Sequence, residues 1–162
     1  MLENNAPFVS VPDGATLCLQ QLSDVFDGLD VTAPQFTLCD VDGDQAMDAL
    51  VMVCIGADVY GYEIFDERDG CVYGYPAYYR ALQDLKTDGT SVSSSGASDT
   101  GFGLLSFDET GLGFQPIAYC ESTATGGVRY VAQGEEITEA AFQQLAQAQY
   151  AKPDQPWYDM VK

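Results

Sequence analysis

An acidic stretch at residues 40–48 is the feature that most constrains what this chain can fold into. Its aspartates occupy positions 1, 3, 5 and 9 of a nine-residue window: Asp40, Asp42, Asp44 and Asp48. The flanking segments, about 35–40 and 48–56, are rich in apolar residues and favour strands. The sequence therefore predicts a strand, an acidic loop and a second strand on a β-rich scaffold.

The spacing of these carboxylates predicts a site for a hard cation. Neighbouring carboxylates repel each other by about 1 kcal/mol per pair at ~4 Å even in bulk water. Calcium binds about six to eight oxygen atoms, and a tight loop supplies several of them. The predicted metal ligands are the side chains of Asp40, Asp42, Asp44 and Asp48 and the backbone carbonyl of Ala46. The alternative is a solvated acidic turn without metal.

Two positions separate this loop from the helix–loop–helix calcium hand. Position 6, a glycine in that motif, is Gln45, and position 12, a bidentate glutamate, is Val51 inside the predicted second strand. The window instead resembles the strand–loop–strand calcium loops of integrin-like propeller repeats, which implies Asp48 as the last ligand. The sequence shows no convincing second copy of the loop, which argues against a full propeller of repeated blades.

Composition narrows the function classes. The chain has 162 residues, 6 basic residues and a net charge of −19, which disfavours nucleic acid and anionic lipid as partners. The absence of histidine excludes Ser-His-Asp and Cys-His catalysis and histidine zinc sites. The five cysteines form no C-x-x-C pair and stand in apolar contexts, which favours reduced, buried thiols. No apolar run approaches the roughly 18 residues of a membrane span.

The predicted fold class is α+β, an antiparallel β-meander of about six to eight strands with an N-terminal and a C-terminal helix. Apolar spacing predicts the first helix over 14–27, and Thr138 as N-cap predicts the second over 140–150. The strand at 48–56 is apolar on both faces, which indicates a central strand. We expect one domain, 1–162, with an irregular lead at 1–12 and a C-terminal tail at 152–162.

Three segments carry a resemblance to a known group: FTLCDVDGDQAMDALVMV, VYGYEIFDERDGCVYGY and GEEITEAAFQQLAQAQY. Across about residues 13–151 the chain resembles uncharacterised secreted proteins and lipoproteins of anaerobic gut bacteria, which share an Asp-rich D-x-D-G-D-G-x-x-E-L hairpin. Asp40, Asp42, Gly43 and Asp44 match that pattern, Asp48 replaces its usual acid, and Gln45 replaces its second glycine. The resemblance implies an extracellular or cell-surface location, with the export signal absent from this sequence, and no established activity.

The favoured function is a non-enzymatic extracellular binding or structural module for an unknown protein or carbohydrate ligand, with a calcium-stabilised hairpin loop. Its tyrosines at 60–79 are candidates for a recognition surface or for ordinary sheet core. A second hypothesis is a carboxylate-dependent, glycosidase-like hydrolase, with candidate acids Glu63, Asp66, Glu109 and Glu121. The third is an intracellular domain with an unmetallated acidic turn. Because no catalytic site is visible, the first hypothesis is preferred.

Overall fold

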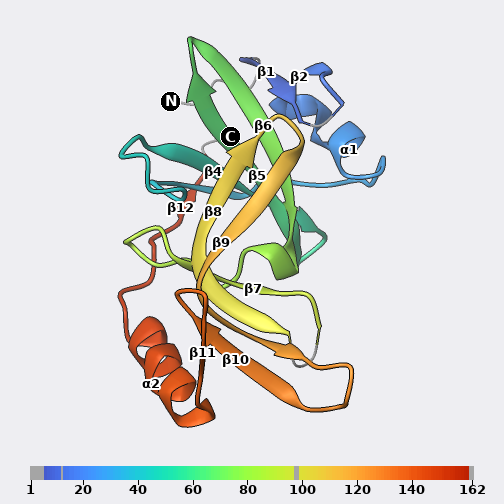
Figure 1. Ribbon diagram of the computed structural model, residues 1–162. Coiled ribbons are helices and arrows are strands. Elements are labelled where there is room, and N and C mark those ends of the chain that lie inside the picture. The colour runs from blue at the N-terminus through green and yellow to red at the C-terminus, as the bar shows by residue number, and fades with distance from the viewer. Residues whose placement is uncertain (1–5, 12, 97–98, 161–162) are drawn as a thin grey trace.

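The computed structural model describes residues 6–11, 13–96 and 99–160, which form two β-sheets and two α-helices (Figure 1). The first sheet has seven strands in the order β12-β3-β4-β5-β6-β1-β2. Their bounds are β1 Pro7–Ser10, β2 Thr16–Cys18, β3 Gln35–Cys39, β4 Asp48–Ile55, β5 Asp58–Arg68, β6 Cys71–Tyr78 and β12 Tyr158–Asp159. All neighbours are antiparallel except β1 and β6, which pair in parallel.

The second sheet has five strands in the order β11-β10-β9-β8-β7. Their bounds are β7 Ser91–Ser94, β8 Thr100–Asp108, β9 Gly111–Ser122, β10 Val128–Ala132 and β11 Glu135–Ile137. The helices are α1, Leu22–Val25, which follows a 3-10 turn, and α2, Glu139–Tyr150. Among the described residues, no helix has the length and apolar character needed to span a bilayer.

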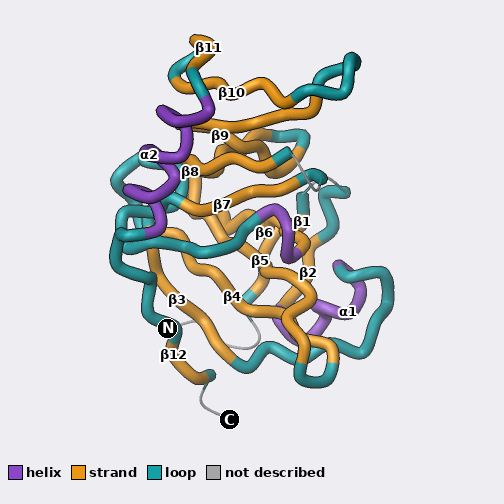
Figure 2. The backbone as a smooth tube through the Cα atoms, turned by 90° about the horizontal axis from the view of Figure 1, so that it is seen from below, coloured by secondary structure: helices purple, strands orange, loops and turns teal. Residues whose placement is uncertain are grey.

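The long β8–β9 hairpin crosses one face of the first sheet, and α1 lies on the side away from α2 (Figures 1 and 2). Between the sheets lies an apolar cluster that includes Leu50, Ile64, Tyr75 and Leu105. On the other face a second cluster joins β4 and β5 to the segment containing β1 and α1. A third packs α2 against β8 and β9. The first sheet is therefore covered on both faces at its centre.

Strand β4 confirms the prediction of a two-sided central strand. Leu50 packs between the sheets, whereas Val51 and Val53 pack on the opposite face, and all three are fully buried. Met52 is half-buried against the first cluster. The alternation of the pleat therefore sends apolar side chains into two different clusters from one strand.

The structure is a mix of α and β, as predicted, but a single meander of about six to eight strands is wrong, because the described residues contain twelve strands in two sheets, one of which includes a parallel pair. The predicted helix over 14–27 is also wrong: residues 16–18 pair with β1, and only one short α-helical segment, α1, follows. Asp27 and Gly28 adopt φ of 54° and 69°, and this left-handed pair ends the helical segment early. The C-terminal helix is confirmed, with the Thr138 hydroxyl accepting the Ala141 N–H at 3.2 Å.

Other boundaries differ from expectation for local reasons. Strand β1 forms inside the expected irregular lead, and β12 inside the expected tail, while residues 1–5, 12 and 161–162 lie outside the described residues. Strand β6 continues through Pro76, although proline is disfavoured inside a strand. β1 reaches only Tyr73 and Gly74, so Pro76 stands where β6 pairs with β5 alone, and a missing N–H is tolerated on such an edge.

Candidate metal centre

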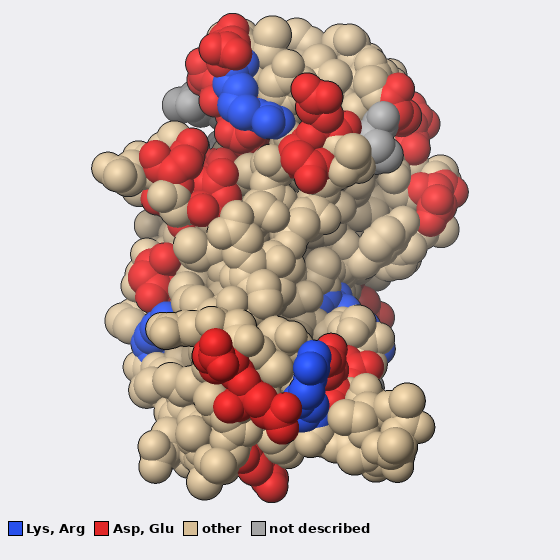
Figure 3. Space-filling model, in the orientation of Figure 1, with Lys and Arg blue, Asp and Glu red and all other residues tan. Residues whose placement is uncertain are grey.

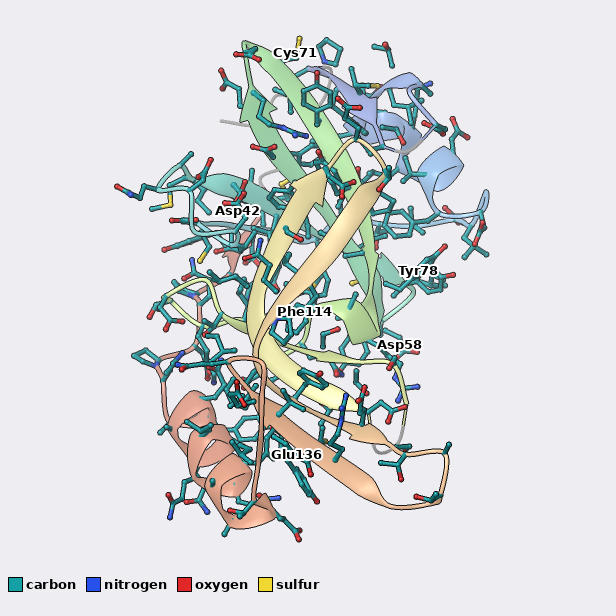
Figure 4. The ribbon with its side chains drawn as sticks, in the orientation of Figure 1. Asp42, Asp58, Cys71, Tyr78, Phe114 and Glu136 are labelled. Atoms are coloured by element: carbon teal, nitrogen blue, oxygen red, sulfur yellow. The ribbon has the colours of Figure 1, made fainter. Side chains whose placement is uncertain are left out.

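The acidic loop connects β3 to β4 beside β8, and its tip points into solvent (Figure 4, where Asp42 is labelled). Its base is fixed by two contacts. The carbonyl of Val41 accepts the Leu105 N–H at 2.8 Å, which joins the loop to the second sheet. Gly89 packs so closely that an added Cβ would stand 1.8 Å from the Asp40 carbonyl oxygen. The loop is therefore held by two segments that are distant in sequence.

Backbone N–H groups of the loop donate to its own aspartates. The two carboxylate oxygens of Asp40 accept the N–H groups of Gly43 at 2.7 Å and Gln45 at 3.0 Å. Asp42 accepts the Asp44 N–H at 3.2 Å, and Asp44 accepts the Ala46 N–H at 2.6 Å. These local bonds, which aspartate side chains favour in turns, fix the directions of three carboxylates.

Gln45 adopts the backbone conformation that glycine usually provides at this position. Its φ is 73°, in the left-handed region, and Gly43 has φ of 84°. A non-glycine residue there costs on the order of 1 kcal/mol. The loop therefore keeps a tight turn although Gln45 replaces the second glycine of the pattern.

Three of the predicted ligands converge. Carboxylate oxygens of Asp40, Asp42 and Asp48 lie within 4.8 Å of one another, a set that does not include Asp44. Asp48 is buried at the first residue of β4, and its Oδ2 accepts the Val41 N–H at 3.0 Å. Asp44 and the Ala46 carbonyl, the other two predicted ligands, belong to the exposed tip of the loop.

Burial and mutual repulsion make this site costly to ionise. Burial, with smaller contributions from the charges of Asp42 and Asp66, raises the pKa of Asp48 to about 7 against the opposing Val41 hydrogen bond. The pKa of Asp42 is also raised, first by burial and then by Asp44 and Asp40. A divalent cation at the shared position would remove this repulsion and favour the ionised forms.

Asp66, on β5, is the acid near this site that sequence reasoning assigned to a different role. Ala49 pairs with Phe65, so Asp48 and Asp66 stand at adjacent positions of neighbouring strands, and Asp66 is buried. Its carboxylate forms an ion pair with the Arg68 Nε at 2.6 Å. The pairing register of β4 and β5 brings Asp66 next to Asp48, and this register cannot be predicted from the spacing of residues in the sequence.

Arg68 lines a cleft of about 370 Å³ between the tips of the β5–β6 and β8–β9 hairpins. Its guanidinium lies 4.7 Å from the centre of the Tyr73 ring and donates to the Tyr75 hydroxyl. Asp108 and Glu109 line the same cleft, and Figure 3 shows how few basic side chains the visible face carries among its carboxylates. Arg68 is already paired with Asp66, so the guanidinium contributes to the internal charge balance of this region.

The other candidate residues lie in separate surroundings. Glu63 and Asp66 point to opposite faces of β5, Glu109 lies in the β8–β9 turn, and Glu121 forms an exposed ion pair with Arg129. The tyrosines at 60–79 do not share one surface either: Tyr62 and Tyr75 are buried, whereas Tyr78 and Tyr79 are exposed. Cys39, Cys54 and Cys120 are buried as expected, Cys18 is half-buried, and Cys71 is exposed, contrary to expectation.

Comparison with protein-family models, with curated proteins and with solved structures gives no match for this chain.

Proposed function

We propose that this chain is a binding or structural module of the extracellular space or cell surface, and that its β3–β4 loop binds one calcium ion. The convergence of Asp40, Asp42 and Asp48 within 4.8 Å is the observation that carries the proposal. Asp44 and the Ala46 carbonyl complete the proposed ligand set from the loop tip, together with water. An all-oxygen set suits a hard cation.

Calcium fits this loop better than magnesium. Magnesium requires near-octahedral geometry and gives up its waters reluctantly, whereas calcium accepts irregular oxygen sets. The carboxylate oxygens of Asp40 and Asp44 already accept hydrogen bonds from backbone N–H groups of the loop. Fewer of their lone pairs are therefore free for a metal ion, which makes strict octahedral ligation difficult. With no glutamate at position 12, the affinity expected is that of extracellular modules, about 10⁻⁴–10⁻³ M.

The ion would act as a local clamp for the fold. Its ligands span the end of β3 and the start of β4, and Val41 between them bonds to β8 of the second sheet. At about 1 mM calcium, binding of this strength adds roughly 0.4–1.4 kcal/mol to the free energy of unfolding. The ligand of the module itself is a protein or carbohydrate of unknown identity.

Thermal unfolding tests whether the β3–β4 loop binds calcium. Melting temperatures are measured in chelator, in 1–10 mM calcium and in the same concentrations of magnesium, at matched ionic strength because a cation screens a chain of net charge −19. Calcium is expected to raise the wild-type melting temperature by about 1–5 °C at ~1 mM. Asp42→Asn should abolish that increase.

The matched control is Asp58→Asn. It removes one negative charge from an exposed aspartate at the start of β5, at the far end of the β4–β5 pair from Asp48 (Figure 4). This variant should retain the full calcium response. Equal stabilisation by calcium and magnesium in the wild type and both variants would identify general screening and refute the site.

A further inference from the structure

Glu63 is a buried acid that the proposed metal site does not use. It lies at the middle of β5 and is fully buried, and neither carboxyl oxygen has a hydrogen-bond partner within the part of the chain that the structure describes. Its cross-strand partners are Val51 on β4 and Pro76 on β6. An unpaired charged carboxylate in such surroundings costs several kcal/mol, so the group is held there as the neutral acid.

Strand β1 closes the space around this carboxyl. A Cβ added to Gly74 would meet the Glu63 Oε1 at 2.4 Å and the Phe8 ring at 2.5 Å, so carboxyl and ring share the space above this glycine. The Phe8 ring also packs edge-on against Phe65, with ring centroids 4.9 Å apart. Phe8 is therefore the side chain that separates Glu63 from solvent on the β1 side.

The attachment of β1 to the sheet is short. Two residue pairs, Val9 with Tyr73 and Ser10 with Gly74, join β1 to β6. The Val11 N–H adds one bond to the Gly74 carbonyl at 2.9 Å. Few contacts hold this edge, in contrast to the eight registered pairs between β5 and β6, so it belongs to the least stable part of the sheet.

Among the described residues, the charged groups around Glu63 offer it no counter-ion. Asp13, beyond β1, is exposed, as are Asp24 in α1 and Asp27 just after it, and Glu67 lies farther along the same face of β5. The neighbours on β4 and β6 are the apolar residues Val51, Val53 and Pro76. Burial, with a smaller contribution from Asp13, raises the pKa of Glu63 to about 8.

We infer that Glu63 is a proton-controlled latch: loss of its proton to solvent releases β1 from the edge of β6. The ionised carboxylate must reach water, and displacement of Phe8 with β1 opens a route that breaks only the short β1–β6 pairing. Release also uncovers the N–H and C=O groups of the β6 edge, which then become available for pairing with another strand.

Linkage fixes the sign and form of the pH dependence. In the closed state Glu63 keeps its proton up to about pH 8, whereas a solvent-exposed glutamate loses it near its ordinary value. Between these two values, opening releases one proton, so the open population rises about tenfold per pH unit and levels off above pH 8. The closed state is favoured at low pH and is progressively lost as the pH rises.

Amide hydrogen exchange measured by NMR tests the latch. The Val11 N–H reports the β1–β6 contact, and the Val92 N–H, bonded to the Gln83 carbonyl at 2.7 Å, reports a site on the other sheet. Between pH 5.5 and 7.5, the wild-type protection factor of Val11 should fall about tenfold per pH unit, with intrinsic exchange rates divided out. That of Val92 should change far less.

In Glu63→Gln the Val11 protection factor should not change with pH. Glu63→Leu, which buries no polar group, serves as the second variant if the amide destabilises the fold, and should give the same flat profile. Either a flat wild-type profile or an equal slope in the wild type and the variants would overturn the latch. Parallel loss of protection at Val11 and Val92 would also overturn it, because opening would then involve the whole domain.

Discussion

Asp48 and Glu63 are both buried acids of the first sheet with raised pKa values, yet their surroundings differ. Asp48 accepts the Val41 N–H and lies beside two further carboxylates at a loop that opens to solvent. Glu63 has apolar neighbours on both adjacent strands and no hydrogen-bond partner among the residues described. The difference teaches that burial alone does not decide a role: donors and access to ions favour a cation at Asp48 and a retained proton at Glu63.

The largest expected effect comes from a second acid beside Glu63. Val51 is fully buried and pairs directly with Glu63, so Val51→Asp places another unpaired carboxyl in the same apolar cluster. The free energy of unfolding should fall by more than about 4 kcal/mol, which unfolds a domain of ordinary stability. Ile55→Asp, at the exposed end of the same strand, is the control and should melt close to wild type in a thermal scan.

Gly89→Ala tests whether the acidic loop depends on its support. The new Cβ would stand 1.8 Å from the Asp40 carbonyl oxygen, so the loop or the turn has to move. We expect a loss of about 3 kcal/mol, combining backbone strain with the clash, and loss of the calcium response. Gly126 has a similar positive φ of 83°, but a Cβ added there would meet no atom within 4 Å. Gly126→Ala therefore measures the cost of backbone strain without a clash. Equal melting temperatures for the two variants would contradict the support.

The raised pKa of Asp48 can be tested by measuring the free energy of unfolding as a function of pH in the presence of chelator. Its folded pKa of about 7 exceeds the unfolded value, so its contribution is fully present at low pH and lost as the pH rises to about 7. The free energy of unfolding should therefore fall by up to about 1.4 kcal/mol per pH unit from this group between pH 4 and 7. Denaturant titrations should show a shallower slope for Asp48→Asn. An identical slope would remove Asp48 as the source.

Parts of this comparison could be predicted from sequence. The β3–β4 hairpin, the burial of Leu50, Val51 and Val53, and α2 with its Thr138 cap all follow local patterns, and the structure confirms them. Three aspartates of the predicted site also converge. These features depend on residues close in sequence, where periodicity and capping are informative.

The remaining features depend on contacts between distant segments. Apolar spacing near Leu17 and Leu19 is compatible with a helix, but pairing with β1 turns residues 16–18 into a strand, and β1 itself pairs with β6 more than sixty positions away. In α2, Phe142 and Ala146 face the core as their apolar spacing predicts, but Leu145 is exposed and Gln149 is buried, where its amide donates to the Thr90 hydroxyl. The sequence does not predict the burial of Glu63, because charged residues are rarely fully buried.

The smallest expected effect comes from relaxing the turn. Gln45 holds φ of 73°, which glycine adopts at no steric cost. Gln45→Gly should raise the free energy of unfolding by up to about 1 kcal/mol and strengthen calcium binding. Thermal melts in chelator and in calcium measure the two effects separately. A lower melting temperature in chelator would show that Gln45 makes a favourable contact that outweighs its backbone strain.

A calcium titration followed through backbone amide NMR signals tests the metal site most directly. The N–H groups of Val41, Gly43, Gln45 and Ala46 all donate within the loop or to Asp48, so they should shift together and saturate with a midpoint of about 10⁻⁴–10⁻³ M calcium. Magnesium should move them less, and Asp42→Asn should remove the saturation. Small, unsaturated shifts spread over the acidic surface, equal for both ions, would contradict the site.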